Sequence, residues 1–298
     1  MRIGVFGNSS KDSVGQAVNM LLSIGKKYPL QFFLHEDLKE SMGHSSPESS
    51  AQLQYRSSPA LVETSDIIIT FGGDGTILSA ARMVGRSQVP ILGVNLGKLG
   101  FMAEVSLDEL ELFVSDIVQG KFVTEERMLL KTTVEQNETE FYALNDIVID
   151  NGSSSRLINV SVYVDNDYLV SFSGDGIILA TPTGSTAYSL AAGGPIVGPA
   201  TGVIVIQPIS PHSLSARTVI VPDSSKVRIV VEHQSNEARV TADGQFVKTF
   251  APPKNIHISK AEYTILLIKR KDRSYYDVLR AKLFWGSDIR SVKGNENE

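Results

Sequence analysis

The chain has 298 residues, of which 42% are hydrophobic and 20% are charged, and its net charge is −5 at pH 7. This length suits about two domains of roughly 150 residues each, and the negative charge argues against a general nucleic-acid binder, which would carry surplus Lys and Arg. The chain has no cysteine, which excludes disulfides, thiol catalysis and thiolate metal sites. The sequence shows neither a signal-peptide core nor a run near the roughly 20 apolar residues that span a bilayer, so we expect a cytoplasmic protein that binds no membrane.

In the first half of the chain, short apolar runs alternate with segments whose apolar residues recur at helical spacing. Residues 13–27, for example, place Val14, Val18 and Leu21 on one helix face. Residues 41–59 are rich in Ser and contain two prolines, which predicts a long surface loop. The expected strands lie within residues 2–7, 30–36, 66–75 and 89–95, and the expected helices are residues 13–27, 76–84 and 107–120. This alternation predicts an α/β domain with a parallel sheet and helices on its faces.

The second half is rich in β-type patterns. Ile158, Val160, Val162 and Val164 fall on one face of an expected strand, and polar residues fall on the other. Further strands are expected within residues 202–209, 218–223, 226–233, 237–250 and 256–270, and the main helical pattern is residues 185–194. We therefore expect a β-rich C-terminal domain, with the boundary near residues 125–141 and a frayed polar tail at residues 294–298.

The stretch TFGGDGT, residues 70–76, follows an apolar run and precedes an expected helix. Glycines at this point permit a tight turn and a close approach by a ligand, and the helix N-terminus near Thr76 attracts anions. An aspartate repels phosphate, so Asp74 fits a group that takes a proton from a hydroxyl or lies near a bound cation. The alternative is that Asp74 only caps the helix, because Asp is a favoured N-cap residue.

Two further segments follow expected strands or interrupt them. Residues 93–105 carry three glycines within eight positions, which indicates close backbone approach, but they match no dinucleotide fingerprint or P-loop, so a plain turn is the default. In ALNDIVID, residues 143–150, Asn145 and Asp146 lie among apolar residues and need hydrogen-bond partners. These partners could be backbone groups, or the amino group of an adenine and the hydroxyls of a ribose.

The segment SGDGIILATPTGSTAYSLAAGGP, residues 173–195, is the most informative in the chain. It contains a second Asp-Gly pair, an expected strand, and then five hydroxyl residues within eight positions. A turn stabilised by Ser or Thr, together with a helix N-cap from Ser185 or Thr186, explains one or two of these hydroxyls but not all five. A serine nucleophile is disfavoured, because TGSTA is not G-x-S-x-G and no His lies close in sequence. The five hydroxyl residues are Thr181, Thr183, Ser185, Thr186 and Tyr188.

A third Asp-Gly pair occurs in TADGQF, residues 241–246, between two β-type runs. Such a pair first of all indicates a hairpin turn. The five histidines form no pair at metal-ligand spacing, so we assign no zinc site and predict no metal-ligand residues.

Taken together, these segments resemble the NAD kinase family. The GGDGT motif is shared with diacylglycerol and sphingosine kinases, whereas GDGIILATPTGSTAYSLAAGGP is highly specific, and ALND, GKLGFMAE, PISPHSLSAR and DGQ occur in the family's order. The similarity runs from residue 1 to about residue 290 and is close to the bacterial single-module members. It implies an α/β domain over residues 1–130, a β-rich NAD-binding domain over residues 131–270, and a C-terminal segment, residues 271–298, that returns to the N-terminal domain.

The resemblance also implies an activity. The family transfers the γ-phosphoryl group of ATP, or a phosphoryl group of inorganic polyphosphate, to the 2′-hydroxyl of the adenosine ribose of NAD, which makes NADP. This transfer needs positioning, charge neutralisation and an acceptor for the hydroxyl proton. Asp74 matches the family's catalytic aspartate, and a divalent ion, Mg²⁺ as first choice, would offset its repulsion of phosphate. Family members are homodimers or homotetramers with sites near subunit contacts.

The resemblance assigns the NAD-binding residues one by one. Asn145 and Asp146 match the pair that holds adenine and ribose, Gln245 matches a polar contact after Asp-Gly, and Phe101 is expected near a base. Arg156 stands where the family has a basic residue or His. The full expected binding set is Asp74, Gly75, Phe101, Asn145, Asp146, Arg156, Asp175, Thr183, Thr186, Ala187, Tyr188, Ser189, Leu190, Ala191 and Gln245.

Three positions depart from the family's pattern. Ser173 stands where many relatives have a basic residue, Ala216 replaces a frequent polar residue, and Thr218 stands where Pro is usual. Two alternative functions stay open: a lipid or other small-molecule kinase that shares GGDGT, and a catalytically silent sensor that binds NADP(H). The β-rich half with TPTGSTAY and DGQ disfavours the first, and the intact Asp74 disfavours the second.

Overall fold

The computed structural model describes residues 1–8, 12–42, 53–97, 100–103, 105–135, 140–152, 156–232 and 237–285. The chain divides into two compact units. Unit 1 comprises Met1–Glu125 and the C-terminal part from Leu266, and unit 2 comprises Glu126–Ile265. Unit 1 is an α/β fold with a parallel sheet and unit 2 is β-rich, so the predicted fold class is confirmed.

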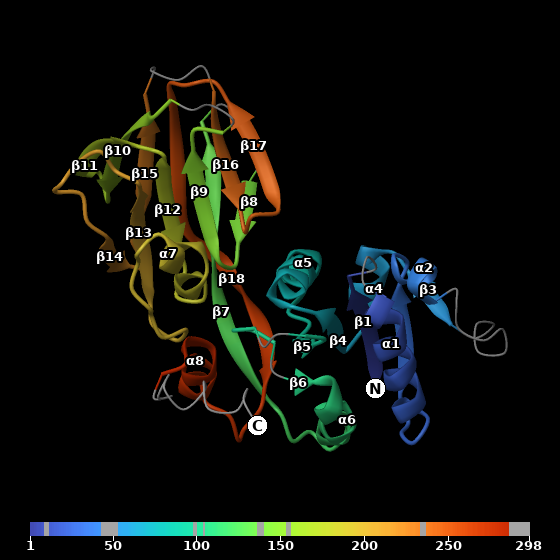
Figure 1. Cartoon of the computed structure of the whole chain (residues 1–298). Coiled ribbons are helices and arrows are strands. Elements are labelled where there is room, and N and C mark those ends of the chain that lie inside the picture. The colour runs from blue at the N-terminus through green and yellow to red at the C-terminus, as the bar shows by residue number, and fades with distance from the viewer. Residues whose placement is uncertain are drawn as a thin grey trace, which may run out of the picture. The chain divides into compact units, whose positions relative to one another are not determined.

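Unit 1 is built on a parallel sheet, coloured blue to teal in Figure 1. The strand order is β3–β2–β1–β4–β5, and β6 and the end of β18 also pair with β5. Each of these pairings is parallel. The strands are β1 (Arg2–Gly7), β2 (Gln31–His35), β3 (Gln54–Arg56), β4 (Ile67–Gly72), β5 (Ile91–Asn95), β6 (Val105–Ser106) and β18 (Lys254–Lys269).

Helices cover both faces of this sheet. α1 (Asp12–Gly25) and α6 (Leu110–Val118) contact each other on one face, where Val18 and Val114 are buried against strand residues such as Val5. α5 (Asp74–Val84) lies on the other face, where Ile77 fills the space beside Gly93. Burial on both faces explains why the strands are continuous apolar runs without alternation. Among the described residues of unit 1, the remaining helices are α2 (Leu38–Met42), α4 (Ser58–Thr64), α8 (Tyr275–Leu283) and the 3-10 helices Gly85–Ser87 and Leu107–Glu109.

The prediction of one long loop over residues 41–59 is wrong in part. α2 ends at Met42, β3 adds a strand to the sheet beside β2, and α4 begins at Ser58. β3 has only three residues, which is too short to show a pattern within its Ser-rich surroundings. Residues 43–52 of the predicted loop, and the predicted frayed tail at residues 294–298, lie outside the described residues.

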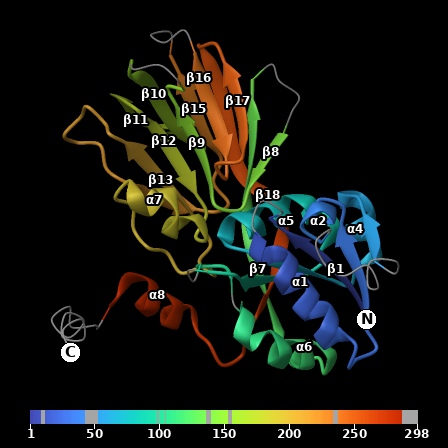
Figure 2. The ribbon, with the colours of Figure 1, turned by 45° about the vertical axis from the view of Figure 1, so that its right-hand side comes forward.

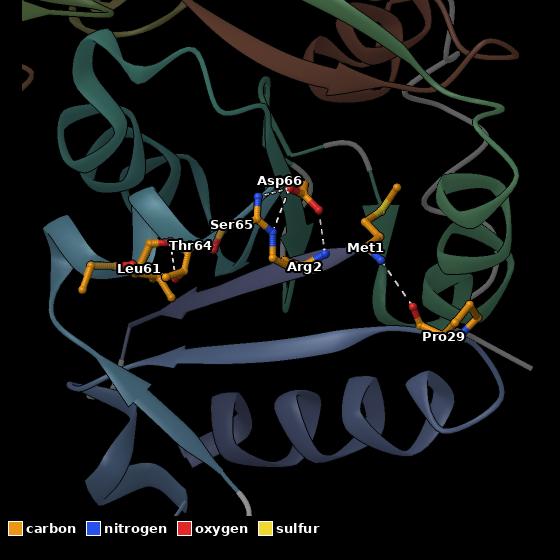
Figure 3. A network of polar contacts seen from close by, with 8 residues as sticks. Met1, Arg2, Pro29, Leu61, Thr64, Ser65 and Asp66 are labelled. Carbon is orange, nitrogen blue, oxygen red and sulfur yellow. Dashed lines mark hydrogen bonds and ion pairs between the residues drawn. The ribbon is translucent and has the colours of Figure 1, made fainter.

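The start of β1 is held between its two neighbours in the sheet (Figure 3). Arg2 donates its backbone N–H to Asp66 Oδ2 at 2.8 Å and its Nη2 to Asp66 Oδ1 at 2.6 Å, directly before β4. The N-terminal ammonium of Met1 donates to the carbonyl oxygen of Pro29 at 3.3 Å, just before β2. The side chains of Arg2 and Asp66 are 50% and 41% exposed, so water screens this ion pair and it fixes position more than it adds stability.

Unit 2 consists of two packed antiparallel sheets, green to orange in Figure 2. One has the strand order β14–β13–β12–β9–β16–β17, and the other contains β11–β10–β15–β18, with β7 paired to β18 and β8. The 3-10 helix Gly184–Thr186 and α7 (Tyr188–Ala191) follow β12. The strands are β7 (Val123–Val134), β8 (Glu140–Ala143), β9 (Asp146–Asp150), β10 (Ile158–Val164), β11 (Asp167–Gly174), β12 (Gly176–Ala180), β13 (Val203–Ile209), β14 (Val219–Pro222), β15 (Val227–Val231), β16 (Ala238–Ala242) and β17 (Phe246–Phe250).

The inner faces of the two sheets share one hydrophobic core, which includes Ile149 and Leu179 from one sheet and Val160 and Ile229 from the other. The alternation predicted for β10 is confirmed, because its apolar residues belong to this core or pack against it. Ser161 is the exception on the polar face: it is buried, and its hydroxyl pairs with that of Ser171 on β11 at 2.7 Å. In the part of the chain that the structure describes, no helix combines the length and apolar character that a membrane span requires.

Candidate functional site

In unit 1, the GGDG turn connects β4 to α5, and Asp74 is the first residue of the helix. The carboxylate of Asp74 accepts hydrogen bonds from three consecutive backbone N–H groups. Phe101 N donates to Oδ2 at 2.7 Å, and Met102 N and Ala103 N donate to Oδ1 at 3.1 and 3.3 Å. N–H donors of this kind stabilise a negative charge. Asp74 therefore holds the loop after β5 against the start of α5.

The interpretation of Asp74 as a helix cap is wrong. The helix begins at Asp74, two residues before the predicted start at Thr76, and Gly73 occupies the N-cap position without a side-chain hydrogen bond. The Asp74 side chain instead turns to the loop of residues 101–103. A carboxylate has about four lone-pair sites, so three backbone donors leave one site for a further donor, such as a substrate hydroxyl.

Gly100 permits this close contact. A Cβ atom on Gly100 would lie 2.0 Å from Asp74 Oδ1, so any other residue would push the loop away from the carboxylate. The glycines of residues 93–105 thus have a steric role at this position, beyond that of a plain turn. Phe101 is half-buried, and the Lys282 ammonium of α8 lies 5.4 Å from the centre of its ring. The C-terminal helix therefore contacts the loop that Asp74 holds.

Unit 2 contains a pocket of about 470 Å³ that runs along β9 and β16. Four predicted residues come together there: Asn145, Asp146, Ala187 and Tyr188. The other lining residues, which the sequence analysis did not assign, are Val148, Asp150, Arg239, Thr241, Asp243, Gly244 and Val247.

The Asp146 carboxyl is almost wholly buried in this pocket, with 4% of the residue exposed. Burial, which disfavours the charged form, and the neighbouring Asp243 carboxylate raise the pKa of Asp146 to about 7. A hydrogen bond from the backbone N–H of Tyr188 acts in the opposite direction. Asp146 can therefore donate a hydrogen bond below neutral pH and only accept hydrogen bonds above it.

The predicted hairpin in TADGQF is confirmed, since Ala242 at the end of β16 pairs with Phe246 at the start of β17. Asp243 occupies the turn with a left-handed backbone (φ 54°), and Gln245, a predicted binding residue, is exposed in the same turn. The Asp243 carboxylate points to the segment before β9, where Asn145 N donates to its Oδ1 at 2.7 Å. A single sequence shows the turn but cannot show this contact over 98 residues.

Asp150 and Arg239 form an ion pair beside the pocket. The two residues are register partners on β9 and β16, and Arg239 donates Nε to Oδ1 and Nη2 to Oδ2 of Asp150, both at 2.9 Å. This two-point geometry gives a defined orientation. With Arg239 matched to Asp150, Asp146 and Asp243 leave the pocket with an excess of acidic groups.

The hydroxyls of TPTGSTAY are satisfied within the protein more fully than predicted. Four of the five take part in hydrogen bonds inside unit 2, whereas the sequence analysis explained one or two, and Tyr188 is 46% exposed. The cap assignment to Ser185 or Thr186 is also wrong, because Ala187 holds the N-cap position of α7. The four contacts are Thr181 Oγ1 to Leu144 O at 2.6 Å, Ser185 Oγ to Pro182 O at 2.7 Å, Thr186 Oγ1 to Thr183 O at 3.1 Å and Arg127 Nη1 to Thr183 Oγ1 at 3.3 Å.

This turn packs directly on the segment that carries Asn145. A Cβ atom on Gly184 would lie 2.0 Å from the carbonyl oxygen of Asn145, so only glycine fits there. Thr181 N also donates to that carbonyl oxygen, at 2.9 Å. The hydroxyl-rich turn thus supports the pocket as a scaffold, and Ala187 and Tyr188 line it directly.

The other predicted residues of the α7 segment differ in exposure. Ser189 is fully buried, Leu190 is half-buried and Ala191 is exposed. Tyr188 and Ala191 also line a second hollow, of about 600 Å³. In that hollow the Thr218 hydroxyl, at one of the departures from the family pattern, donates to Gln207 Oε1.

Two predicted binding residues, Asp175 and Arg156, are not among the residues that line the pocket. Asp175 directly precedes Gly176, the first residue of β12, which pairs with the lining residue Asp150 of β9. Asn151 donates its N–H to Asp175 O at 3.2 Å and its Nδ2 to Arg156 O at 3.3 Å. Asp175 and Arg156 are therefore close to each other and to Asn151, which follows the lining residue Asp150, but neither lines the pocket itself.

Among the described residues, no group of three or more His, Asp or Glu side chains is arranged to hold a metal ion. In unit 1, Asp74 is the one acidic residue in the GGDG turn.

Both halves of the chain match domains of one protein family. Residues 3–122 match the family model of the ATP-NAD kinase N-terminal domain, and residues 144–270 match that of the ATP-NAD kinase C-terminal domain. An NAD kinase of Ectopseudomonas mendocina is 39% identical over 291 residues, which cover 96% of this chain and 97% of that protein. The chain belongs to the NAD kinase family. The resemblance drawn from GGDGT and TPTGSTAY is confirmed.

Further relatives support the same assignment. An NAD kinase of Pseudomonas fluorescens is 40% identical over 96% of both chains. Among solved structures, a yeast NADH kinase complexed with NADH has a TM-score of 0.88 at 27% identity, covering 97% of this chain and 89% of that chain. An NAD kinase from Archaeoglobus fulgidus in complex with ATP has a TM-score of 0.74 at 26% identity, covering 94% and 99%. Because NAD kinases match both halves of the chain, the alternative of a lipid kinase that shares only GGDGT is not supported.

Proposed function

We propose that this protein is an NAD kinase, which transfers the γ-phosphoryl group of ATP to the 2′-hydroxyl of the adenosine ribose of NAD. The ribose oxygen forms a bond to the γ-phosphorus, the bond from that phosphorus to the β–γ bridging oxygen breaks, and ADP leaves. The hydroxyl proton needs an acceptor. The observation that carries this assignment is the match of both halves of the chain, in order, to the two domains of ATP-NAD kinases.

The pocket of unit 2 suits the adenosine part of NAD. Its excess of acidic groups disfavours a phosphate and favours groups that donate hydrogen bonds, such as the adenine amino group and ribose hydroxyls. Asn145 offers both a donor and an acceptor, and Asp146 offers a carboxyl group that changes from donor to acceptor near neutral pH. Tyr188 supplies an aromatic surface at the pocket wall.

Asp74 is the proposed acceptor of the hydroxyl proton. Its carboxylate is held in one orientation by the three N–H groups of residues 101–103, and one lone-pair site remains for the ribose hydroxyl. A base in a fixed position contributes roughly 10²–10⁴-fold to such a reaction. The same geometry gives Asp74 a second role, because removing the carboxylate also releases the loop that carries Phe101.

The remaining members of the expected binding set stay proposals of the same kind. Gly75 next to Asp74, and Phe101 in the loop, belong to unit 1. Arg156, Asp175 and Gln245 belong to unit 2, together with the α7 segment. The described contacts support Asn145, Asp146, Ala187 and Tyr188 most directly, because they line one pocket.

We propose Mg²⁺ as the divalent ion of the reaction. Mg²⁺ usually keeps several waters and binds substrate phosphates, so the phosphates of ATP could hold it near the GGDG turn without a direct bond to Asp74, whose remaining lone-pair site serves the ribose hydroxyl. When bound, the ion would neutralise charge on the transferred phosphoryl group.

The donor, the acceptor and the assembly are proposed more broadly. The solved neighbours were captured with NADH and with ATP, which supports testing both NAD and NADH as acceptors and ATP beside polyphosphate as donors. We further propose a homodimer or homotetramer, as the family resemblance implies, and a cytoplasmic location, with which the absence of cysteine is compatible.

The proposed function is tested by measuring NADP(H) formation from NAD or NADH with ATP or polyphosphate, with Mg²⁺ or with EDTA. We expect NADP from NAD, ATP and Mg²⁺, and no product after EDTA treatment until Mg²⁺ is restored. Tight NADPH binding without product under every condition would instead identify the silent sensor and overturn the proposal.

A further inference from the structure

Two aspartates of this chain make the same contact, one in each unit. Asp74 accepts three consecutive backbone N–H groups in unit 1. In unit 2, the Asp243 carboxylate likewise accepts hydrogen bonds from three consecutive backbone N–H groups. Leu144 N donates to its Oδ2 at 2.9 Å, and Asn145 N and Asp146 N donate to its Oδ1 at 2.7 and 3.2 Å. Family resemblance assigned a role to Asp74 but none to Asp243.

Thr181 binds the carbonyl oxygens of Leu144 and Asn145, but the N–H groups of these two residues are bound by Asp243. Residues 144 and 145 lie between β8 and β9, where no strand pairing satisfies their N–H groups. An N–H group that is buried without an acceptor costs stability, and a carboxylate is a stronger acceptor than a carbonyl oxygen. One carboxylate that takes three successive N–H groups therefore fixes the path of the backbone through Asn145 and Asp146.

The hairpin turn explains how Asp243 reaches this position. Strands β16 and β9 are paired up to Ala242 and Ile147, and the turn that follows places Asp243 beside the segment before β9. The Asp243 backbone is left-handed, with φ 54°, a conformation in which Asp and Asn are tolerated better than most residues. Its N–H also donates to the carbonyl oxygen of Asp146 at 3.0 Å, so turn and segment are bonded in both directions.

We propose that Asp243 is a positioning residue for NAD binding, which holds Asn145 and Asp146 in the pocket through their backbone N–H groups. This inference rests on the proposed function, since it gives Asn145 and Asp146 their role toward NAD. Asp243 needs no contact with the dinucleotide for this effect.

Electrostatics supports the same assignment. The negative charge of Asp243 is one of the causes that raise the pKa of Asp146, after burial. The other charged groups at this pocket are Asp150 and Arg239, which are matched to each other. Removing the charge of Asp243 should therefore lower the pKa of Asp146 while Asp150 and Arg239 stay paired.

The test compares Asp243→Asn with Asp165→Asn. Asn keeps the left-handed turn but replaces one oxygen by an NH₂ group, which faces an N–H donor and cannot accept from it. Asp165 is a matched control, because it also has a left-handed backbone (φ 51°) in a hairpin turn of unit 2 and its Oδ1 accepts the N–H of Lys226 at 2.8 Å. It lies outside the pocket.

Three quantities are measured on the full-length protein: the dissociation constant for NAD by calorimetry without ATP, its dependence on pH, and amide hydrogen exchange. We expect Asp243→Asn to weaken NAD binding by about tenfold or more, since at least one hydrogen bond to a charged acceptor is lost. The NAD dissociation constant should change with pH around the pKa of Asp146, near pH 7, and this inflection should move to lower pH in the variant. The amides of residues 144–146 should exchange at least about tenfold faster. Asp165→Asn should leave the NAD affinity, its pH dependence and the amide exchange of residues 144–146 unchanged.

Unchanged NAD affinity and unchanged inflection in Asp243→Asn would overturn the inference, while NADP formation by the wild-type protein would leave the proposed function standing. If the wild-type protein makes no NADP, the proposed function fails. The exchange rates of residues 144–146 still decide in that case whether Asp243 holds the segment: equal rates in variant and wild type overturn it. An Asp243→Ala variant that folds should exceed the asparagine variant in each effect.

Discussion

Asp74 has two proposed roles: it accepts the hydroxyl proton, and it holds the loop of residues 101–103. Replacement of Asp74 by asparagine affects both roles, so the loop needs its own control. The asparagine oxygen can keep the N–H groups of Met102 and Ala103, which now lie 3.1 and 3.3 Å from Oδ1. The new NH₂ group then faces the N–H of Phe101, which is 2.7 Å from Oδ2. Two donors at that distance repel each other, so the loop must move at Phe101.

The magnitudes follow from these contacts. Loss of one hydrogen bond to a charged acceptor costs about 1.5–3 kcal/mol, which loosens the loop of residues 101–103. Loss of a general base lowers turnover by a further factor of roughly 10²–10⁴. We expect kcat of Asp74→Asn to fall by at least about 10³-fold, with folding of unit 2 and NAD binding to its pocket retained.

A Gly100→Ala variant controls for the loop. Its Cβ would lie 2.0 Å from Asp74 Oδ1, so it displaces the loop but keeps the carboxylate. We measure kcat and KM for NAD with ATP and Mg²⁺, the NAD dissociation constant and the thermal unfolding midpoint for both variants. The general-base role predicts that Gly100→Ala retains far more turnover than Asp74→Asn at a similar loss of stability. Equal losses of turnover in the two variants would refute it, and so would full activity of Asp74→Asn.

Three further predictions concern unit 2. Gly184→Ala should lower the unfolding free energy by about 1–3 kcal/mol and weaken NAD binding, as calorimetry can show, because its Cβ would lie 2.0 Å from the Asn145 carbonyl oxygen. Tyr188→Phe should keep KM for NAD within about twofold, whereas Tyr188→Ala should raise it by about tenfold, because the ring lines the pocket; equal values for both would contradict this. The pKa of Asp146 is raised to about 7, so between about pH 4 and pH 7 the folded protein keeps a proton that the unfolded chain has lost. The protonated Asp146 carboxyl therefore contributes at most about 4 kcal/mol to the unfolding free energy, and this contribution should be lost as pH rises through that window. Urea titrations at several pH values should show this loss in the wild-type protein but not in Asp146→Asn.

Local pattern was sufficient for most of the fold. The strands of unit 1 are continuous apolar runs because helices cover both faces, and β10 alternates because only one face meets the core. The turn of TADGQF was likewise predicted from its two central residues. β3 was missed, because three residues beside a Ser-rich stretch carry neither period.

The sequence predicted which residues belong to the candidate site better than it predicted the contacts that these residues make. Asp74 and Asp243 both stand in Asp-Gly pairs that the sequence shows. Each accepts three backbone N–H groups, which lie 27–29 residues away for Asp74 and 97–99 residues away for Asp243. The hydroxyls of TPTGSTAY suggested a surface that binds a ligand. In the structure, three of them donate hydrogen bonds to backbone carbonyl oxygens of unit 2. Polar side chains at turns find partners through tertiary structure, which residue spacing does not encode.

The position of the new phosphate on the product tests the proposed NAD kinase activity most directly. Purified protein is incubated with NAD, ATP and Mg²⁺, and the product is characterised by mass spectrometry and by ³¹P–¹H correlation NMR. We expect one added phosphoryl group, coupled to the 2′ proton of the adenosine ribose. A phosphoryl group on any other hydroxyl would contradict the proposed transfer to the 2′-hydroxyl of NAD. Unmodified NAD after prolonged incubation with enough protein to bind it would also contradict it.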